Sequence, residues 1–155
     1  MKRIVLAASG IVAVSLAAAV LPPLAVHNPL RHTSMPAGTY TFAHFPPAAV
    51  GEVVIVRDLA RFGFTAGELI KRVKGVGGQT FCWHPALNRH AIDGRPMPEI
   101  DRQAVARGIR PWTGCRRLET NEIVGYGETP DSFDSRYLGP LRFSDLWGVY
   151  REPRP

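Results

Sequence analysis

Two side chains of this sequence have the types that a nucleophilic hydrolase needs, Ser34 and Lys71. A serine hydroxyl is a poor nucleophile unless a nearby base removes its proton. The sequence contains no Gly-x-Ser-x-Gly pattern, which would indicate the usual histidine-dependent site, but a Ser-Lys pair is a known variant. Lysine can act as the base only when it is neutral, and this requires burial among apolar groups. Leu69, Ile70 and Val73 surround Lys71 in the sequence and would provide that environment.

Taken alone, each of the two residues also has an ordinary explanation. Ser34 stands just before Pro36, as serines in turns do. Lys71 and Arg72 could be solvated charges on the surface of a strand. Whether Ser34 and Lys71 form a site therefore depends on the segments around them.

Those segments resemble, in the same order along the chain, the boxes that characterise the type I signal peptidases. They are Ser34-Met35-Pro36 with Gly38 and Tyr40, Gly51-Glu52-Val53-Val54-Ile55-Val56, Lys71-Arg72-Val73-x-Gly75-x-x-Gly78, Gly94-Arg95-Pro96-Met97-Pro98 with Cys115-Arg116-Arg117-Leu118, and Ser132-Phe133-Asp134-Ser135-Arg136-Tyr137-x-Gly139-Pro140. The first and fourth sets are most similar to the conjugative-transfer, TraF-like branch of that family. The resemblance covers most of residues 34–150.

The resemblance implies a role for each residue that it matches. Ser34 would attack the scissile carbonyl, and Lys71 would take its proton and later activate water. Ser132 matches the serine that orients the lysine. Asp134 and Arg136 match a structural ion pair that holds the closing box against the lysine strand. The implied activity is that of a serine endopeptidase.

The oxyanion of the tetrahedral intermediate needs hydrogen-bond donors. The backbone N–H of Ser34 would be one of them. In signal peptidases a second, side-chain donor often comes from two residues before the nucleophile, and that position is His32 here. Thr33 is the alternative donor.

The expected fold is mainly β, a signal-peptidase-like antiparallel β-fold with one N-terminal transmembrane helix. The content of 15 Gly and 14 Pro residues favours many short strands over long helices. A turn at Asp93-Gly94 is typical of a hairpin, and 99–110 is expected to be a polar surface segment. The predicted strands are 39–42, 52–57, 69–74, 79–83, 122–126 and 147–150.

The N-terminus predicts two parts for the chain. Ile4 to Val26 contains no charged residue and is about as long as a bilayer core requires. The basic head Lys2-Arg3 should stay in the cytoplasm. Residues 1–26 are therefore expected to form a signal-anchor in the inner membrane, and residues 27–155 a periplasmic catalytic β domain. A cleaved secretory signal ending near Ala17-Ala18-Ala19 is the alternative.

The chain has two cysteines, Cys82 and Cys115, and both follow the apolar segment. An even count in an oxidising compartment indicates a disulfide. The bond would close a loop of about 34 residues and contribute about 3–4 kcal/mol. Two unpaired, buried thiols are the alternative.

Composition limits the partners of the chain. The net charge of +6 favours attraction to an anionic membrane face over binding of nucleic acid. The histidines form no cluster in the sequence, and Cys82-Trp83-His84 is not a zinc spacing. We therefore expect no nucleic acid, no metal and no cofactor.

The partner implied by the resemblance is a precursor protein, either a pilin precursor or another exported protein. Relatives bind the segment to be cut as an added β-strand, with shallow pockets for small side chains. Two alternatives remain open on the sequence. One is a general signal peptidase that removes signal peptides from secreted proteins. The other is a non-enzymatic, anchored β-domain of a secretion system.

Overall fold

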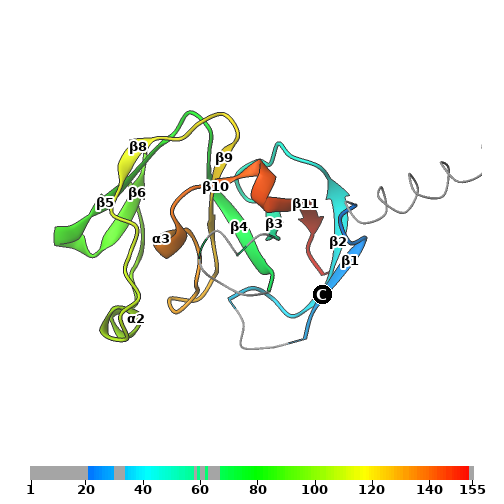
Figure 1. Ribbon diagram of the computed structural model, residues 1–155, viewed down its shortest axis with the longest axis horizontal. Coiled ribbons are helices and arrows are strands. Elements are labelled where there is room, and N and C mark those ends of the chain that lie inside the picture. The colour runs from blue at the N-terminus through cyan, green and yellow to red at the C-terminus, as the bar shows by residue number, and fades with distance from the viewer. Residues whose placement is uncertain (1–20, 30–33, 58, 60–61, 63–66, 154–155) are drawn as a thin grey trace, which may run out of the picture.

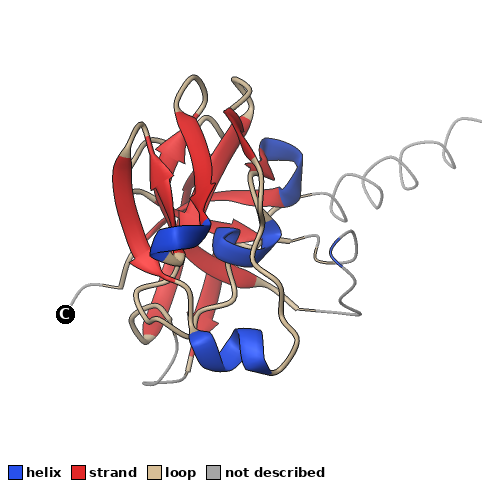
Figure 2. Cartoon of the chain, turned by 90° about the vertical axis from the view of Figure 1, so that its left-hand side faces the viewer, coloured by secondary structure: helices blue, strands red, loops and turns tan. Residues whose placement is uncertain are grey.

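The computed structural model describes residues 21–29, 34–57, 59, 62 and 67–153 of the 155-residue chain. Within them the protein is built mainly of antiparallel strands in two sheets. Figure 1 shows the smaller sheet at one end of the molecule and strands β1, β2 and β11 at the other. Figure 2 shows that the helices are short. The expected mainly β, antiparallel fold is confirmed for these residues.

The larger sheet has seven strands in the order β1-β2-β11-β3-β4-β9-β10. Strand β3 lies in its middle, and all four of its residues are buried. Val54 and Val56 pack in one apolar cluster, and Val53 and Ile55 pack in another. Because successive side chains point to opposite faces, both faces of β3 are covered, and its sequence is continuously apolar. The strands are β1 (Ala25–Asn28), β2 (Gly38–His44), β3 (Val53–Val56), β4 (Leu69–Val76), β9 (Glu122–Tyr126), β10 (Leu141–Arg142) and β11 (Leu146–Arg151).

The smaller sheet has four strands in the order β7-β6-β5-β8. It follows directly from β4, because only residues 77–79 separate β4 from β5. Its Phe81 and Ile92 pack with Val124 and Tyr126 of β9, so one apolar cluster joins the two sheets. The strands are β5 (Thr80–His84), β6 (Arg89–Ile92), β7 (Arg95–Glu99) and β8 (Cys115–Arg117).

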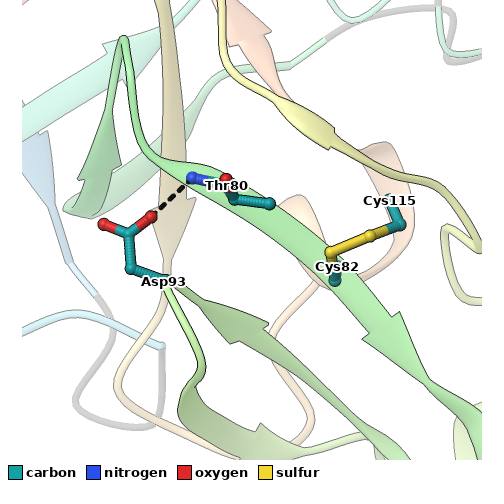
Figure 3. Close-up of a disulfide and its surroundings, with 4 residues drawn as sticks. All are labelled: Thr80, Cys82, Asp93 and Cys115. Atoms are coloured by element: carbon teal, nitrogen blue, oxygen red, sulfur yellow. Dashed lines mark hydrogen bonds between the residues drawn. A yellow bond between two sulfur atoms is a disulfide. The ribbon is translucent and has the colours of Figure 1, made fainter.

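The predicted disulfide is present. Cys82 of β5 lies opposite Cys115 of β8, and their sulfur atoms are bonded (Figure 3). The turn expected at Asp93-Gly94 joins β6 to β7, and the Asp93 carboxylate accepts the Thr80 N–H at 2.7 Å. The disulfide therefore fixes the three-residue strand β8 to the edge of this sheet.

The helices are the α-helices α2 (Arg102–Ala106) and α3 (Ser135–Leu138) and the 3-10 turns η2 (Pro85–Leu87) and η3 (Phe143–Asp145). The Asp101 carboxylate caps α2 by accepting the Gln103 N–H. This helix lies within the polar segment 99–110 expected from the sequence. The Asp134 carboxylate caps α3 in the same way, by accepting the Arg136 N–H.

The six predicted strands all form, with ends shifted by no more than a few residues. Strands β1, β6, β7, β8 and β10 and helix α3 were not among the predicted elements, although the expected Asp93-Gly94 turn does join β6 to β7. Strand β1 contains Ala25 and Val26, the last two residues of the expected membrane segment. Residues 1–20 of that segment lie outside the described part of the chain. In the described part, no helix is long and apolar enough to cross a membrane.

Candidate active site

Strand β4 brings Lys71 to Ser34. The Lys71 Nζ lies 2.8 Å from the Ser34 Oγ and 2.9 Å from the Ser132 Oγ. These three residues come from β4, from the turn before β2 and from the loop before α3. All three were predicted to belong to one site, and their side chains are in hydrogen-bonding contact in the structure.

Lys71 is almost completely buried, with 3% of its surface exposed. It lies opposite Val54 of β3, and Val73, two residues along β4, is also buried. Burial lowers the pKa of Lys71 from 10.5 to about 8, because the charged ammonium loses its water. The nearby Asp134 carboxylate opposes this change but does not cancel it. A lysine with this pKa is partly neutral near physiological pH, as a general base must be.

Gly127 allows the two serines to approach each other. A Cβ atom at Gly127 would lie 2.1 Å from the Ser132 Oγ and 2.5 Å from the Ser34 Cβ, closer than such contacts occur. The next residue, Glu128, donates its backbone N–H to the carbonyl oxygen of Ser34. The segment that follows β9 is therefore attached to the Ser34 turn, and only glycine fits at position 127.

The turn that follows Ser34 is held by two buried side chains. The Asn28 amide donates to the carbonyl oxygens of Met35 and Pro36, at 3.1 and 3.0 Å. The Tyr40 hydroxyl donates to the Pro36 carbonyl at 2.7 Å. Asn28 lies on β1, which pairs with β2, so the first two strands hold the Ser34 turn between them. Neither contact was predicted: Asn28 lies between the apolar segment and the first box, and Tyr40 was assigned to that box without a partner.

Asp134 and Arg136 form an ion pair at 2.8 Å, and neither side chain has exposed surface. The Asp134 carboxylate also accepts the Gly127 N–H at 2.8 Å. The Arg136 guanidinium donates to the carbonyl oxygens of Gly127, Thr129 and Pro130. The ion pair thus holds the loop between β9 and α3, which contains Ser132. Because β9 pairs with β4, this loop is also positioned relative to the strand that carries Lys71.

Arg72, which follows Lys71 on β4, connects three segments near the site. Its guanidinium donates to the carboxylates of Glu128 and Glu152 and to the carbonyl oxygen of Gly51. Arg72 therefore attaches two segments to β4: the one after β9, through Glu128, and the one after β11, through Glu152. Arg72 belongs to the same sequence box as Lys71, but none of these partners was predicted from the sequence.

Two hollows meet at Ser34 and Lys71. The larger hollow has a volume of about 280 Å³ and is lined by Val26, His27, Asn28, Ser34, Met35, Glu68, Leu69, Ile70 and Lys71. The smaller hollow, of about 210 Å³, is lined by Ser34, Leu69, Lys71, Thr129, Asp131, Ser132 and Phe133. A polypeptide that passes over Ser34 could place a side chain in each hollow.

Other candidates from the sequence are not part of this cluster. His32 and Thr33, the possible oxyanion donors, lie outside the described residues. No histidine that the structure describes is hydrogen-bonded to Ser34; His90, for example, contacts the Trp112 carbonyl. Nor do the described residues contain a group of three or more His, Cys, Asp or Glu side chains that could hold a metal ion.

Comparison with known proteins establishes the class to which the chain belongs. The family model of the signal peptidases, peptidase S26, matches residues 1–153. The chain is therefore a member of the signal peptidase family, peptidase S26, and the resemblance inferred from the boxes is confirmed.

The chain is similar to two known proteins. It is 28% identical over 125 residues to a probable conjugal transfer protein TraF of Sinorhizobium fredii (strain NBRC 101917 / NGR234). That alignment covers 68% of this chain and 64% of the relative, so the chain spans less than two thirds of the relative's length. A signal peptidase I of known structure from Enterococcus faecalis V583 matches with a TM-score of 0.43 and 17% identity, over 68% of this chain and 98% of that one.

Proposed function

We propose that this protein is a serine endopeptidase of the signal peptidase type, with Ser34 as nucleophile and Lys71 as general base. The observation that supports this most directly is the position of the Lys71 Nζ, within hydrogen-bonding distance of both Ser34 and Ser132. Its lowered pKa supports the same assignment, because a fully protonated lysine could not accept a proton.

The reaction follows from these contacts. Neutral Lys71 accepts the proton of the Ser34 hydroxyl while the Ser34 Oγ bonds to the carbonyl carbon of the precursor. The resulting ammonium then gives its proton to the amine of the departing segment, and an ester between Ser34 and the other segment remains. Water next attacks the carbonyl carbon of this ester while Lys71 takes its proton. The bond to the Ser34 Oγ then breaks, Lys71 returns the proton to that oxygen, and the segment leaves with a new carboxyl end. Throughout, the hydrogen bond between Lys71 and Ser132 keeps the amine directed at Ser34.

The proposed substrate is the precursor of an exported protein, and specifically of a conjugative pilin. The similarity to a probable conjugal transfer protein supports this choice over a general signal peptidase. The two hollows lie on either side of Ser34, where an extended segment bound across it would place its side chains.

We further propose that the apolar segment before β1, within residues 1–20, anchors the chain in the inner membrane and that the catalytic domain faces the periplasm; residues 25 and 26, expected in the anchor, belong to β1 instead. The uncharged segment Ile4–Val26 and the basic Lys2-Arg3 support this orientation. The Cys82–Cys115 disulfide is in keeping with an oxidising compartment.

Co-expression of the full chain with a pilin precursor encoded beside it would test the function. The wild type should convert the precursor to a shorter product, and Ser34→Ala should not. Ser144→Ala is the matched control, because Ser144 is an exposed serine outside the site. A Ser34→Ala protein that cuts as fast as the wild type would refute the assignment. Cleavage of ordinary secretory precursors at the same rate would instead indicate a general signal peptidase.

A further inference from the structure

The larger hollow beside Ser34 has walls of two kinds. Val26, Met35, Leu69 and Ile70 make much of it apolar. Glu68 also lines it and brings a carboxylate to a site where the chemistry itself requires none. Because Glu68 does not contact the reacting residues, its place in this wall needs another explanation.

The Glu68 carboxylate is fixed in position. The Trp147 indole Nε1 donates to the Glu68 Oε1 at 2.6 Å. The Trp147 ring is itself covered by the Arg57 guanidinium, 5.2 Å from the ring centre. A carboxylate held by a tryptophan has less rotational freedom to lose when a ligand binds, so it is better prepared for an ion pair than a free surface glutamate.

The charge around the hollow contrasts with that of the whole chain. The chain has a net charge of +6, yet of the described residues that line the larger hollow none is arginine. The one lysine is Lys71, whose amine is directed at Ser34 and Ser132. Among the described residues that line the hollow, Glu68 is thus the one carboxylate, and it is directed away from the Lys71 amine's own partners to the Trp147 indole.

From these observations we propose that Glu68 makes the larger hollow select a precursor with a cationic side chain, lysine or arginine, close to the bond that is cut. The proposal rests on the function proposed above. The cationic head would pair with the Glu68 carboxylate, and its aliphatic stem would lie against the apolar wall, as long basic side chains commonly do. Glu68 would then be a residue of substrate specificity, and Ser34 and Lys71 would carry out the reaction.

The test uses the full chain and a series of synthetic peptides with small residues around one cleavable bond. In each peptide a single lysine replaces alanine at one position, within five residues before or after that bond. The parent peptide has alanine at all of these positions. At one position lysine should raise kcat/KM by about three- to tenfold over alanine, and added salt should reduce this preference. Glutamate at that position should lower kcat/KM.

The enzyme variants then assign the preference to Glu68. Glu68→Gln keeps an oxygen for the Trp147 indole and removes the charge, so the ratio of kcat/KM for the lysine peptide to that for the alanine peptide should fall to about one. Glu68→Lys should reverse the preference, so that the glutamate peptide is cut faster. Glu119→Gln, the same change at an exposed residue outside both hollows, should retain the wild-type preference.

Each outcome distinguishes this proposal from the proposed function. If Ser34-dependent cleavage is the same for lysine, alanine and glutamate at every position, the selection by Glu68 is refuted and the peptidase function stands. A lysine preference that survives in both Glu68 variants also refutes it. If no peptide and no precursor is cut by the wild type, the proposed function and this inference fail together.

Discussion

The titration of Lys71 should control how fast the precursor is cut. Burial lowers the pKa of Lys71 from 10.5 to about 8. Because only the neutral amine can accept the Ser34 proton, kcat should rise about tenfold for each pH unit below pH 8 and level off above it. At pH 7 about a tenth of the enzyme would have neutral Lys71, so the rate should be about a tenth of its maximum.

Initial rates of precursor cleavage between pH 6 and 10 would measure this profile. Lys71→Arg should show essentially no cleavage at any pH in that range, because a guanidinium does not give up its proton in a protein. Lys74→Arg, the same change at an exposed lysine of β4, should behave as the wild type. The reasoning is wrong if Lys71→Arg cuts at near the wild-type rate, or if the wild-type rate levels off near pH 6, as for a histidine base.

The same pKa makes a prediction about stability. Between about pH 8 and 10.5 the unfolded chain still binds the Lys71 proton and the folded site has lost it, so the free energy of unfolding should rise with pH in this window. Below about pH 8 the buried ammonium costs the folded state up to about 3 kcal/mol. Lys71→Met should therefore be more stable than the wild type at pH 7, with an advantage that shrinks from pH 8 to 10.5. Urea unfolding at several pH values would test this, and an advantage independent of pH would contradict it.

Three further substitutions test the framework around the site. Gly127→Ala should abolish cleavage and lower the free energy of unfolding by about 1–3 kcal/mol, because its Cβ overlaps Ser132; urea unfolding and a cleavage assay would show both. Asn28→Ala should lower kcat about tenfold and leave the pH profile in place, since it loosens the Ser34 turn without touching Lys71; a shifted profile would contradict this. Arg136→Met should cost about 3–5 kcal/mol of stability by leaving a buried carboxylate unpaired, and part of this loss should be recovered when Asp134 is also replaced by asparagine, which removes the charge and keeps an acceptor for the N–H groups of Gly127 and Arg136.

Local sequence patterns determined much of the fold and the identity of the main site residues. Strand β3 was predictable because a short, continuously apolar segment with charged ends can be buried on both faces. The Cys82–Cys115 bond was predictable from an even number of cysteines after an apolar N-terminus. The order of the boxes predicted that Ser34, Lys71 and Ser132 belong together, because residue type and spacing within each box are local properties, and their side chains are in contact in the structure.

Only the tertiary structure decided how the site is assembled. The burial of Lys71 depends on the pairing of β4 with β3 and β9, segments far apart in the chain. Asn28 reaches the Ser34 turn because β1 is the edge strand next to β2, and Glu68 meets Trp147 across 79 residues of sequence. Such contacts depend on strand order and register, which long-range packing sets and no local pattern of residues records.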